Sequence, residues 1–321
     1  MTWNGIEVID FHVHLPVPWP RTRRGGAAAM RAARPPEAQK ILTDYGLDRR
    51  SQWRKEWNFP DPEEGLAQRS PAEQAARWAA EVDRHGLRGA VMVSGGGNDQ
   101  LAAAIAAHPG KLFGMAHHNL AAPDAGPQLR RAVEDLGFVG LKIIAPGLDV
   151  KLNDPTLNPL WQYCEQRRLP VLIHFGWLGT GGGIIDHPNI NPLVIYEPAS
   201  RYPGIPFVIA HFGCGYWQEV LQLAWSCPGI CVDTSGSNQW MRWVPYQLTL
   251  DDLFRRAYET IGSSRIVFGT DSSWFPRGFS HRYLEEQVRT CRQIGMKDED
   301  VAAVFGGNAA RFLGIKGQLV E

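Results

Sequence analysis

The sequence EVIDFHVH, residues 7–14, joins a β-branched run at residues 7–13 to two histidines spaced two residues apart. Further apolar runs of strand length follow it at residues 89–94, 112–117, 139–144, 171–174, 207–211, 230–233 and 266–271. Stretches of helical length and pattern lie between most of these runs, at residues 100–108, 125–136, 157–168, 192–202, 217–226 and 250–261. Strands that alternate with helices indicate βαβ units and a parallel sheet.

Eight such runs, apolar enough to be buried on both faces, predict an α/β fold closed into a (β/α)8 TIM barrel. An open doubly wound sheet is the competing interpretation. It lacks its usual support, because no G-x-G-x-x-G follows the first run. The 321 residues exceed the usual length of one domain, but single barrels reach this size, so we expect residues 1–321 to form one domain.

The composition argues against several classes of protein. The 33 basic and 33 acidic residues cancel, so no charge excess indicates a nucleic-acid or membrane partner. No apolar run approaches the roughly 18 residues of a transmembrane helix, and the N-terminal residues lack the features of a signal peptide. The five cysteines form no C-x-x-C pair, which favours reduced, mostly buried thiols. We therefore expect a cytoplasmic protein.

The interval between His14 and Gly89 holds 74 residues, whereas one barrel repeat takes about 30. It contains prolines at positions 16, 18, 20, 35, 36, 60 and 62, and tryptophans at positions 19, 53 and 57. The prolines argue against long regular elements, and the tryptophans need a surface to pack on. We expect residues 16–75 to be an inserted loop that forms a lid over the barrel mouth, with residues 21–34 its most mobile part. A disordered segment is the alternative.

Metal-binding side chains stand at the ends of four predicted strands. The first ends in His12 and His14, which share one face of a strand, the fifth in His174, the sixth in His211 and the eighth in Asp271. Each histidine taken alone has a plain interpretation as a hydrogen-bonded strand-end residue. In a barrel, however, all strand ends converge on one mouth, so these five side chains would meet there. Imidazole and carboxylate are ligands of zinc, manganese and iron at catalytic sites.

The motifs around these residues resemble the amidohydrolase superfamily, and most closely its amidohydrolase-2 branch, which includes the aminocarboxymuconate-semialdehyde decarboxylase-like enzymes. They lie at residues 8–14, 169–174, 208–213, 265–271 and 305–313, and the resemblance spans residues 6–315. It implies a divalent metal held by His12, His14, His174 and Asp271. It also implies that His211 is a proton relay or, with a second metal, a ligand. We expect one zinc ion, and a second ion is left open.

A bound divalent ion can lower the pKa of water from 15.7 to about 7. Asp271 and His211 are then the candidate catalytic residues, because Asp271 can take the proton of this water and His211 can hydrogen-bond the nucleophile or the leaving group. Asp10 and Thr270 are candidate supports for the imidazoles, with strand-end hydrogen bonding as the alternative.

Lys142, in the fourth predicted strand, has three interpretations. It is a carbamylated lysine that bridges two metals, as in some members of the superfamily, a partner of a substrate carboxylate, or a structural lysine that extends out of the barrel. Trp177, Trp274, Arg242 and Arg277 follow strand ends and are further candidate substrate-binding residues.

Three functions follow from these residues. The first is a hydrolase that uses a metal-activated water on an ester, lactone or amide bond of a small molecule. The second is a metal-dependent, non-oxidative decarboxylase of an aromatic or unsaturated carboxylic acid, and the third is a non-catalytic binding protein. The complete set of ligands argues against the third. The segment Gly140-Leu-Lys142 favours the hydrolase, which is the main prediction, and the aromatic mouth favours the decarboxylase, which is the alternative. The oligomeric state is left open.

Overall fold

The structure, a computed structural model, describes residues 3–15, 33–94 and 96–315. Its strands are β1 (Ile9–His14), β2 (Gly89–Ser94), β3 (Leu112–Gly114), β4 (Leu141–Ile144), β5 (Val171–His174), β6 (Phe207–Ile209), β7 (Ile230–Asp233) and β8 (Ile266–Val267). Its α-helices are α2 (Pro36–Glu56), α3 (Pro71–Arg84), α4 (Asn98–Ile105), α5 (Ala125–Glu134), α6 (Asn158–Arg167), α7 (Tyr196–Arg201), α8 (Trp217–Ser226), α9 (Leu250–Ile261), α10 (His281–Gln293), α11 (Asp298–Ala302) and α12 (Asn308–Leu313).

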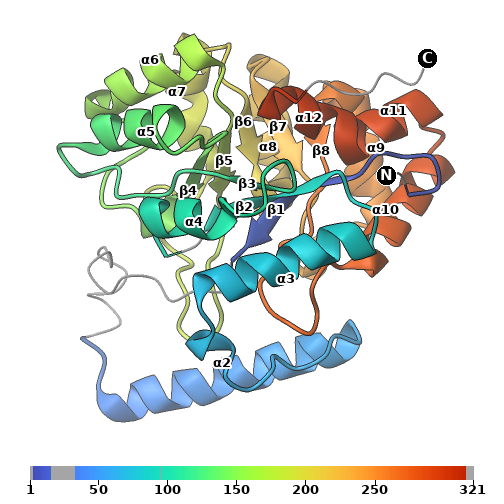
Figure 1. The fold of residues 1–321 in the computed structure, drawn as a ribbon. Coiled ribbons are helices and arrows are strands. Elements are labelled where there is room, and N and C mark those ends of the chain that lie inside the picture. The colour runs from blue at the N-terminus through green and yellow to red at the C-terminus, as the bar shows by residue number, and fades with distance from the viewer. Residues whose placement is uncertain (1–2, 16–32, 95, 316–321) are drawn as a thin grey trace.

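The strands form a closed, parallel barrel, as the sequence predicts. They pair in the orders β1-β2-β3 and β4-β5-β6-β7-β8. The bridge between Ala116 and Leu141 joins the two groups at one side, and the bridge between Val13 and Ser272 joins them at the other. Figure 1 shows the strands at the centre with helices around them, and α2 along one end of the molecule. The predicted (β/α)8 TIM barrel is confirmed.

The barrel interior is filled by alternate residues of its strands. Phe11, Val91, Leu172, Val208 and Val267 belong to one buried cluster, which α12 closes at one end through residues 309–312. The residues between them in sequence face the helices and form the larger cluster. This division follows from the period of two in a strand.

The first strand departs from this period just before its histidines. Phe11 packs in the interior cluster, whereas Val13 packs in the outer one with Val8. A register shift between Asp10 and Val13 accommodates the change. Such a bulge re-aims the side chains that follow it. It therefore lets His12 turn to the interior directly after Phe11.

The interval after β1 contains more helix than its prolines led us to expect, so the expectation of no long regular elements was wrong. Pro35 is the N-cap of the 21-residue helix α2 and Pro36 its first residue, where proline costs nothing, and Pro60 and Pro62 follow its end. Residues 71–75, expected in the insertion, form the first turn of the barrel helix α3, which Ser70 caps. Most of the stretch 21–34 lies outside the described residues.

Helix α2 lies on loops that follow the C-terminal ends of the strands. Near its middle, Gly46 packs against Thr180 and Gly181 of the loop after β5, where a Cβ at Gly181 would collide with the carbonyl oxygen of Leu42. Near its end, the indole of Trp53 donates to the Ser237 hydroxyl of the loop after β7, at 3.0 Å. Glycines 181–183 therefore permit a close backbone approach to a helix, as well as forming a loop at the mouth.

Two smaller predictions concern the thiols and the membrane. All five cysteines are buried and free, as predicted. Within the described parts of the chain, no helix combines the length and the apolar character that crossing a membrane requires.

Candidate active site

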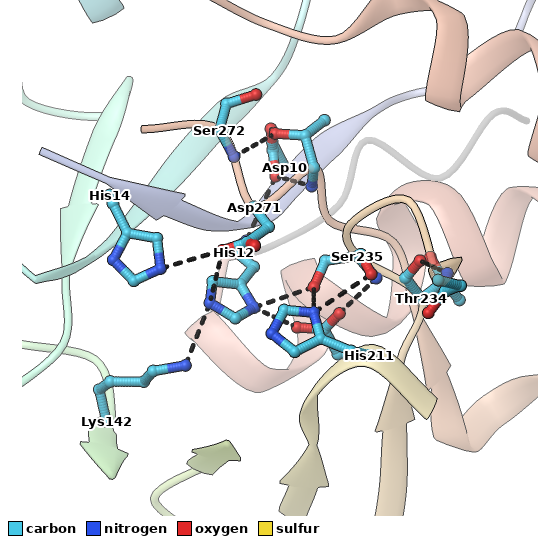
Figure 2. A network of polar contacts seen from close by, with 12 residues as sticks. Asp10, His12, His14, Lys142, His211, Thr234, Ser235, Asp271 and Ser272 are labelled. Atoms are coloured by element: carbon cyan, nitrogen blue, oxygen red, sulfur yellow. Dashed lines mark hydrogen bonds and ion pairs between the residues drawn. The ribbon is translucent and has the colours of Figure 1, made fainter. Parts of the chain in front are cut away.

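His12 is the buried centre of the polar network at the barrel mouth (Figure 2). Its Nδ1 lies 2.6 Å from Asp233 Oδ2 and 3.1 Å from the Ser235 hydroxyl. Burial and the nearby Lys142 lower the pKa of His12 to about 3, so the ring is neutral at pH 7. Burial would raise the pKa of Asp233, but His12 and Ser235 lower it to about 2. A carboxylate at Nδ1 fixes the proton there and leaves the Nε2 lone pair for a metal.

Asp271 brings a carboxylate to the same place as the two histidines of β1. Its Oδ1 lies 3.1 Å from His14 Nε2 and 3.7 Å from His12 Nε2. These three ligand atoms all lie within 4.8 Å of one another, and such a group can hold a metal ion. Although burial opposes ionisation, the surrounding histidines hold the pKa of Asp271 well below its usual range. The residues therefore fit a divalent ion, since they offer two imidazoles and a carboxylate.

The backbone at Asp271 explains how this carboxylate is aimed. Strand β8 ends at Val267, earlier than the predicted residue 271, and Asp271 has a φ of 55°. Its N–H donates to the carbonyl oxygen of His12 at 2.8 Å. A non-glycine residue with positive φ is uncommon and occurs where a site requires it.

His211 lies beside His12 in a similar backbone conformation. Strand β6 ends at Ile209, and His211 follows in a short 3-10 segment with a φ of 56°. Its Nδ1 lies 2.8 Å from the Ser235 hydroxyl and 3.2 Å from the Ser235 carbonyl oxygen. The His211 and His12 rings are stacked at 5.1 Å. His12, His211 and Asp233 form a second group whose ligand atoms converge.

Lys142 points into this network from β4 (Figure 2). It is 2% exposed, and its Nζ lies 3.0 Å from His12 Nε2. Burial lowers the pKa of Lys142 to about 8. The Lys142 ammonium and a metal ion would compete for the one lone pair on His12 Nε2. A metal at His12 therefore requires Lys142 to move or to lose its proton.

Asp10 ties the two metal-ligand strands together. It accepts hydrogen bonds from the Thr270 hydroxyl at 2.5 Å, the Thr270 N–H at 2.9 Å and the His12 N–H at 3.2 Å. Burial raises the pKa of Asp10 to about 7. The predicted supporting pair thus forms, although Asp10 fixes the backbones of β1 and the segment after β8 rather than an imidazole.

Comparison with known proteins identifies the family of the chain that forms this site. The sequence model of one family, described as amidohydrolase, matches residues 9–315. The chain belongs to this amidohydrolase family. The predicted resemblance to the amidohydrolase-2 branch, and with it the class of enzyme, is confirmed.

Named relatives of this amidohydrolase are distant. It is 22% identical to a 2-amino-3-carboxymuconate-6-semialdehyde decarboxylase of Dictyostelium discoideum over 68% of this chain and 65% of that protein. Its fold resembles a 5-carboxyvanillate decarboxylase of Sphingomonas paucimobilis, with 16% identity, a TM-score of 0.62 and coverage of 97% of this chain and 100% of the other. It also resembles a probable 2-pyrone-4,6-dicarboxylic acid hydrolase of Acinetobacter baumannii, with 17% identity, a TM-score of 0.56 and coverage of 96% and 100%. At these identities the structural likeness shows the shared fold.

The structure of the amidohydrolase places the remaining predicted ligand, His174, at the edge of the cluster. Its Nε2 lies 3.2 Å from the carbonyl oxygen of Trp177, and its ring contacts that of His211 edge-on at 5.2 Å. Burial and the nearby His211 and Lys142 lower its pKa well below the usual value. Among the described residues, His174 does not join the ligand atoms that converge. Its role as a ligand stays a prediction.

The predicted substrate-binding residues other than Lys142 lie at three places. Arg242 pairs with Glu56 of α2 at 3.0 Å, with half of its side chain exposed. The ring of Trp177 packs on Trp243 at 4.1 Å, beside the loop after β6. Trp274 and Arg277 lie next to each other in the loop after β8, with the Arg277 guanidinium 4.6 Å from the Trp274 ring. The last pair is therefore the nearest to Asp271 in the chain.

The sequence analysis did not identify two residues of this network, Asp233 and Ser235. Asp233 ends β7 as an acid after an apolar run, which is the pattern that singled out Asp271. Ser235 follows two residues later and bridges the Nδ1 atoms of His12 and His211. The strand-end pattern could have identified Asp233, whereas a serine in a loop carries no such signal.

Proposed function

We propose that this amidohydrolase is a metal-dependent enzyme that removes CO2 without oxidation from an aromatic or unsaturated carboxylic acid. The observation that carries the proposal is the converging group of His12, His14 and Asp271, with His211 stacked beside it. The matched relative is a decarboxylase of an unsaturated acid, and two structural neighbours act on benzoates. These comparisons favour the decarboxylase, which the sequence analysis kept as the alternative to the hydrolase.

The metal would be held by His12 Nε2, His14 Nε2 and Asp271 Oδ1, the ligand atoms that converge. When bound, it would supply positive charge that polarises a substrate oxygen. Zinc remains our first choice because of the nitrogen and oxygen ligands. Manganese is the alternative, since a 5-carboxyvanillate decarboxylase of Novosphingobium aromaticivorans with this fold binds it, whereas an amidohydrolase of Burkholderia multivorans binds zinc.

The reaction replaces a C–C bond by a C–H bond. The bond to the carboxylate breaks, CO2 leaves, and the electron pair that stays on carbon takes a proton. His211 is the proposed relay for this proton, because Ser235 engages its Nδ1 and leaves Nε2 for transfer. Asp271, held ionised by the surrounding histidines, is proposed to accept a proton from solvent water, which replaces the proton that His211 has passed to carbon. Both residues stand on backbone with positive φ, which fixes their directions.

The surroundings favour a flat, anionic small molecule. Trp53, Phe59 and Trp274 pack together at centroid distances of 5.4 to 6.3 Å beside the loop that carries Asp271. Lys142, which a metal at His12 Nε2 would displace from its present contact, supplies a buried amine beside the metal ligands. A planar acid bound beside the metal ligands would therefore have aromatic surface near the loop of Asp271 and the amine of Lys142 near His12. Lys142 is the proposed partner of its carboxylate, with Trp177 as a further substrate contact.

Hydrolysis is the second candidate, and Lys142 favours it as well. A buried ammonium beside the metal ligands can polarise the carbonyl of an ester or lactone as readily as it binds a carboxylate. One structural neighbour is a probable hydrolase of a pyrone dicarboxylic acid. The bridging, carbamylated form of Lys142 belongs with this candidate.

One experiment separates the two candidates. The full chain, reconstituted with zinc or manganese, is incubated with 2,6-dihydroxybenzoate, 5-carboxyvanillate and 2-pyrone-4,6-dicarboxylate. Release of CO2 from a benzoate supports the decarboxylase, and ring opening of the pyrone supports the hydrolase. The surface variant Asp83→Asn, far from the site in an exposed pair with Lys111, should behave as the wild type. If the metal-loaded chain binds and turns over none of the three, both candidates fail for these substrate classes.

We further propose that the segment from residue 33 to residue 70, and α2 above all, is the lid of a single-domain enzyme. Its support is the contact of α2 with loops after β5, β7 and β8, the last through Trp53 on Trp274. A cytoplasmic location and the absence of nucleic-acid or membrane partners remain predictions from the sequence, and whether the chain forms a homo-oligomer remains open.

A further inference from the structure

Arg277 is a partly buried cation among aromatic rings. Its guanidinium carbon lies 4.4 Å from the centroid of the Phe59 ring, 4.6 Å from Trp274, 5.4 Å from Tyr283 and 5.8 Å from Trp53. Within residues 3–15, 33–94 and 96–315, no carboxylate forms an ion pair with it. Burial accordingly lowers its pKa. Asp271 and Asp10 act on this charge without a direct ion pair, and the surrounding rings add to its compensation.

The four rings come from three separate parts of the chain. Trp53 belongs to α2 and Phe59 follows it, Trp274 lies in the loop after β8, and Tyr283 belongs to α10. The guanidinium therefore joins the end of the α2 segment to the barrel. Two hydrogen bonds run beside it, one between backbone groups, from Glu63 N–H to Phe275 O at 2.9 Å, and one from the Trp274 indole to Pro60 O at 3.2 Å.

The same guanidinium also donates to the backbone that aims a metal ligand. Nη1 donates to the Asp271 carbonyl at 3.5 Å, and Nη2 donates to the Thr270 carbonyl at 3.3 Å. Asp271 has the unfavourable φ of 55° at this point. A residue in this conformation persists only where its surroundings determine it, and these two donors are part of those surroundings.

We infer that Arg277 is a positioning residue that couples the docking of residues 53–59 to the placement of the Asp271 carboxylate. When the rings of Trp53 and Phe59 surround the cation, its two N–H groups are held against the backbone at residues 270 and 271. When the segment leaves, the cation loses two of its four rings and is free to turn towards water. The inference rests on the proposed metal site, since it concerns the ligand Asp271.

The test measures metal affinity and docking in separate assays. Affinity for Mn²⁺ and Zn²⁺ is measured by calorimetry, and docking by the rate of tryptic cleavage within residues 36–56. Arg277→Met should weaken metal binding by about 10- to 100-fold, as removal of groups that orient ligands does, and should speed cleavage. Arg277→Lys keeps the positive charge but loses the paired N–H donors of the planar guanidinium, so its metal affinity and cleavage rate should lie between those of the wild type and Arg277→Met. It is the variant to use if Arg277→Met does not fold.

Arg282 offers an independent way to loosen the same segment. Its guanidinium lies 4.6 Å from the Trp57 ring and donates to Trp57 O at 2.9 Å, so it holds residues 53–59 without contacting residues 270 or 271. Arg282→Met should speed cleavage and weaken metal binding in the wild type, and it should have no further effect on metal affinity in Arg277→Met, where the coupling is already absent.

The decisive variant is Phe59→Leu, because Phe59 contacts Arg277 and is not one of the converging metal ligands. It should weaken metal binding several-fold in the wild-type background and have no further effect in Arg277→Met. Unchanged affinity in Arg277→Met, or additive effects of the two substitutions, would overturn the coupling. A wild-type chain that takes up neither ion would instead refute the metal site, and with it the inference.

Discussion

Replacing Asp233 by asparagine tests whether the site is built to leave His12 Nε2 free for a metal. The substitution keeps the shape of the side chain and removes its negative charge. In the structure, Asp233 Oδ2 lies 2.6 Å from His12 Nδ1, and both side chains have no exposed surface. The amide can still accept a hydrogen bond through its oxygen, but it can equally present its NH2 group to Nδ1. In that second arrangement His12 carries its proton on Nε2 and cannot bind a metal.

The expected size of the effect follows from this hydrogen bond. A hydrogen bond to a charged group contributes about 1.5 to 3 kcal/mol and one between neutral groups about 0.5 to 1.5 kcal/mol. The loss is therefore about 1 to 1.5 kcal/mol, or roughly five- to twelvefold in metal affinity. The Ser235 hydroxyl, 3.1 Å from the same nitrogen, can take over part of the role, so the loss should lie at the low end of the 10- to 100-fold typical of such partners.

The assay is competitive titration of the metal-free protein with Zn²⁺ or Mn²⁺ against a chelator. Asp83→Asn is the control, because it removes the same charge from an exposed pair with Lys111. Both variants should keep the far-UV circular dichroism of the wild type. If Asp233→Asn binds metal within twofold of the wild type, the structure-based role of Asp233 is wrong and another group fixes the His12 tautomer.

Three further predictions concern the proton acceptor, the pH dependence of stability and the lid. Asp271→Asn should fold but lose turnover by about 10²- to 10⁴-fold, measured as initial rate in metal-loaded protein, and a near-normal rate would move proton transfer to His211. The pKa of His12 is about 3 in the folded chain against an ordinary value of 6.5, so the unfolded chain binds the proton first and stability is lost as pH falls through this window. In denaturant unfolding of the metal-free protein, His12 should contribute about 2 kcal/mol to the loss of stability between pH 7.5 and pH 5. His174 adds a loss of the same sign, so the loss in His12→Asn should be smaller by about 2 kcal/mol rather than absent, and an equal loss in both proteins would contradict the prediction. Gly181→Ala should displace α2 by its collision with Leu42, which lowers kcat/KM and, through Arg277, also weakens metal binding. Gly110→Ala, with a similar positive φ and open space around it, should leave both unchanged.

The barrel was predictable because its signal is repeated and local. Each strand reads as an apolar run, and the helices between them follow from length and pattern. The meeting of His12, His14, His211 and Asp271 was predictable for a topological reason, since a barrel places all strand ends at one mouth. The predicted ends of two strands were nevertheless imprecise. Strands β6 and β8 end before His211 and Asp271, and both residues have left-handed backbone conformations instead of strand conformations.

The prolines between His14 and Gly89 did not allow helix α2 to be predicted. Pro35 and Pro36 begin the helix and Pro60 follows it, so prolines bound a proline-free stretch long enough for 21 helical residues. Its face towards the barrel carries a weak apolar pattern, since Gly46 is the one buried residue of this helix. Its position depends on contacts with distant loops, which no local pattern encodes.

The sequence by itself determined the class of fold, the chemistry of the strand ends and the family. Tertiary structure decided which of these side chains converge, because hydrogen bonds between residues more than 200 positions apart set their directions. Asp233 and Ser235 orient His12 in this way, whereas His174 turns to the carbonyl of Trp177. Arg242 and Arg277 look alike in the sequence, yet one pairs with Glu56 at the surface and the other is enclosed by rings. The physical reason is that residue type fixes what a side chain can bind, while long-range packing fixes what it reaches.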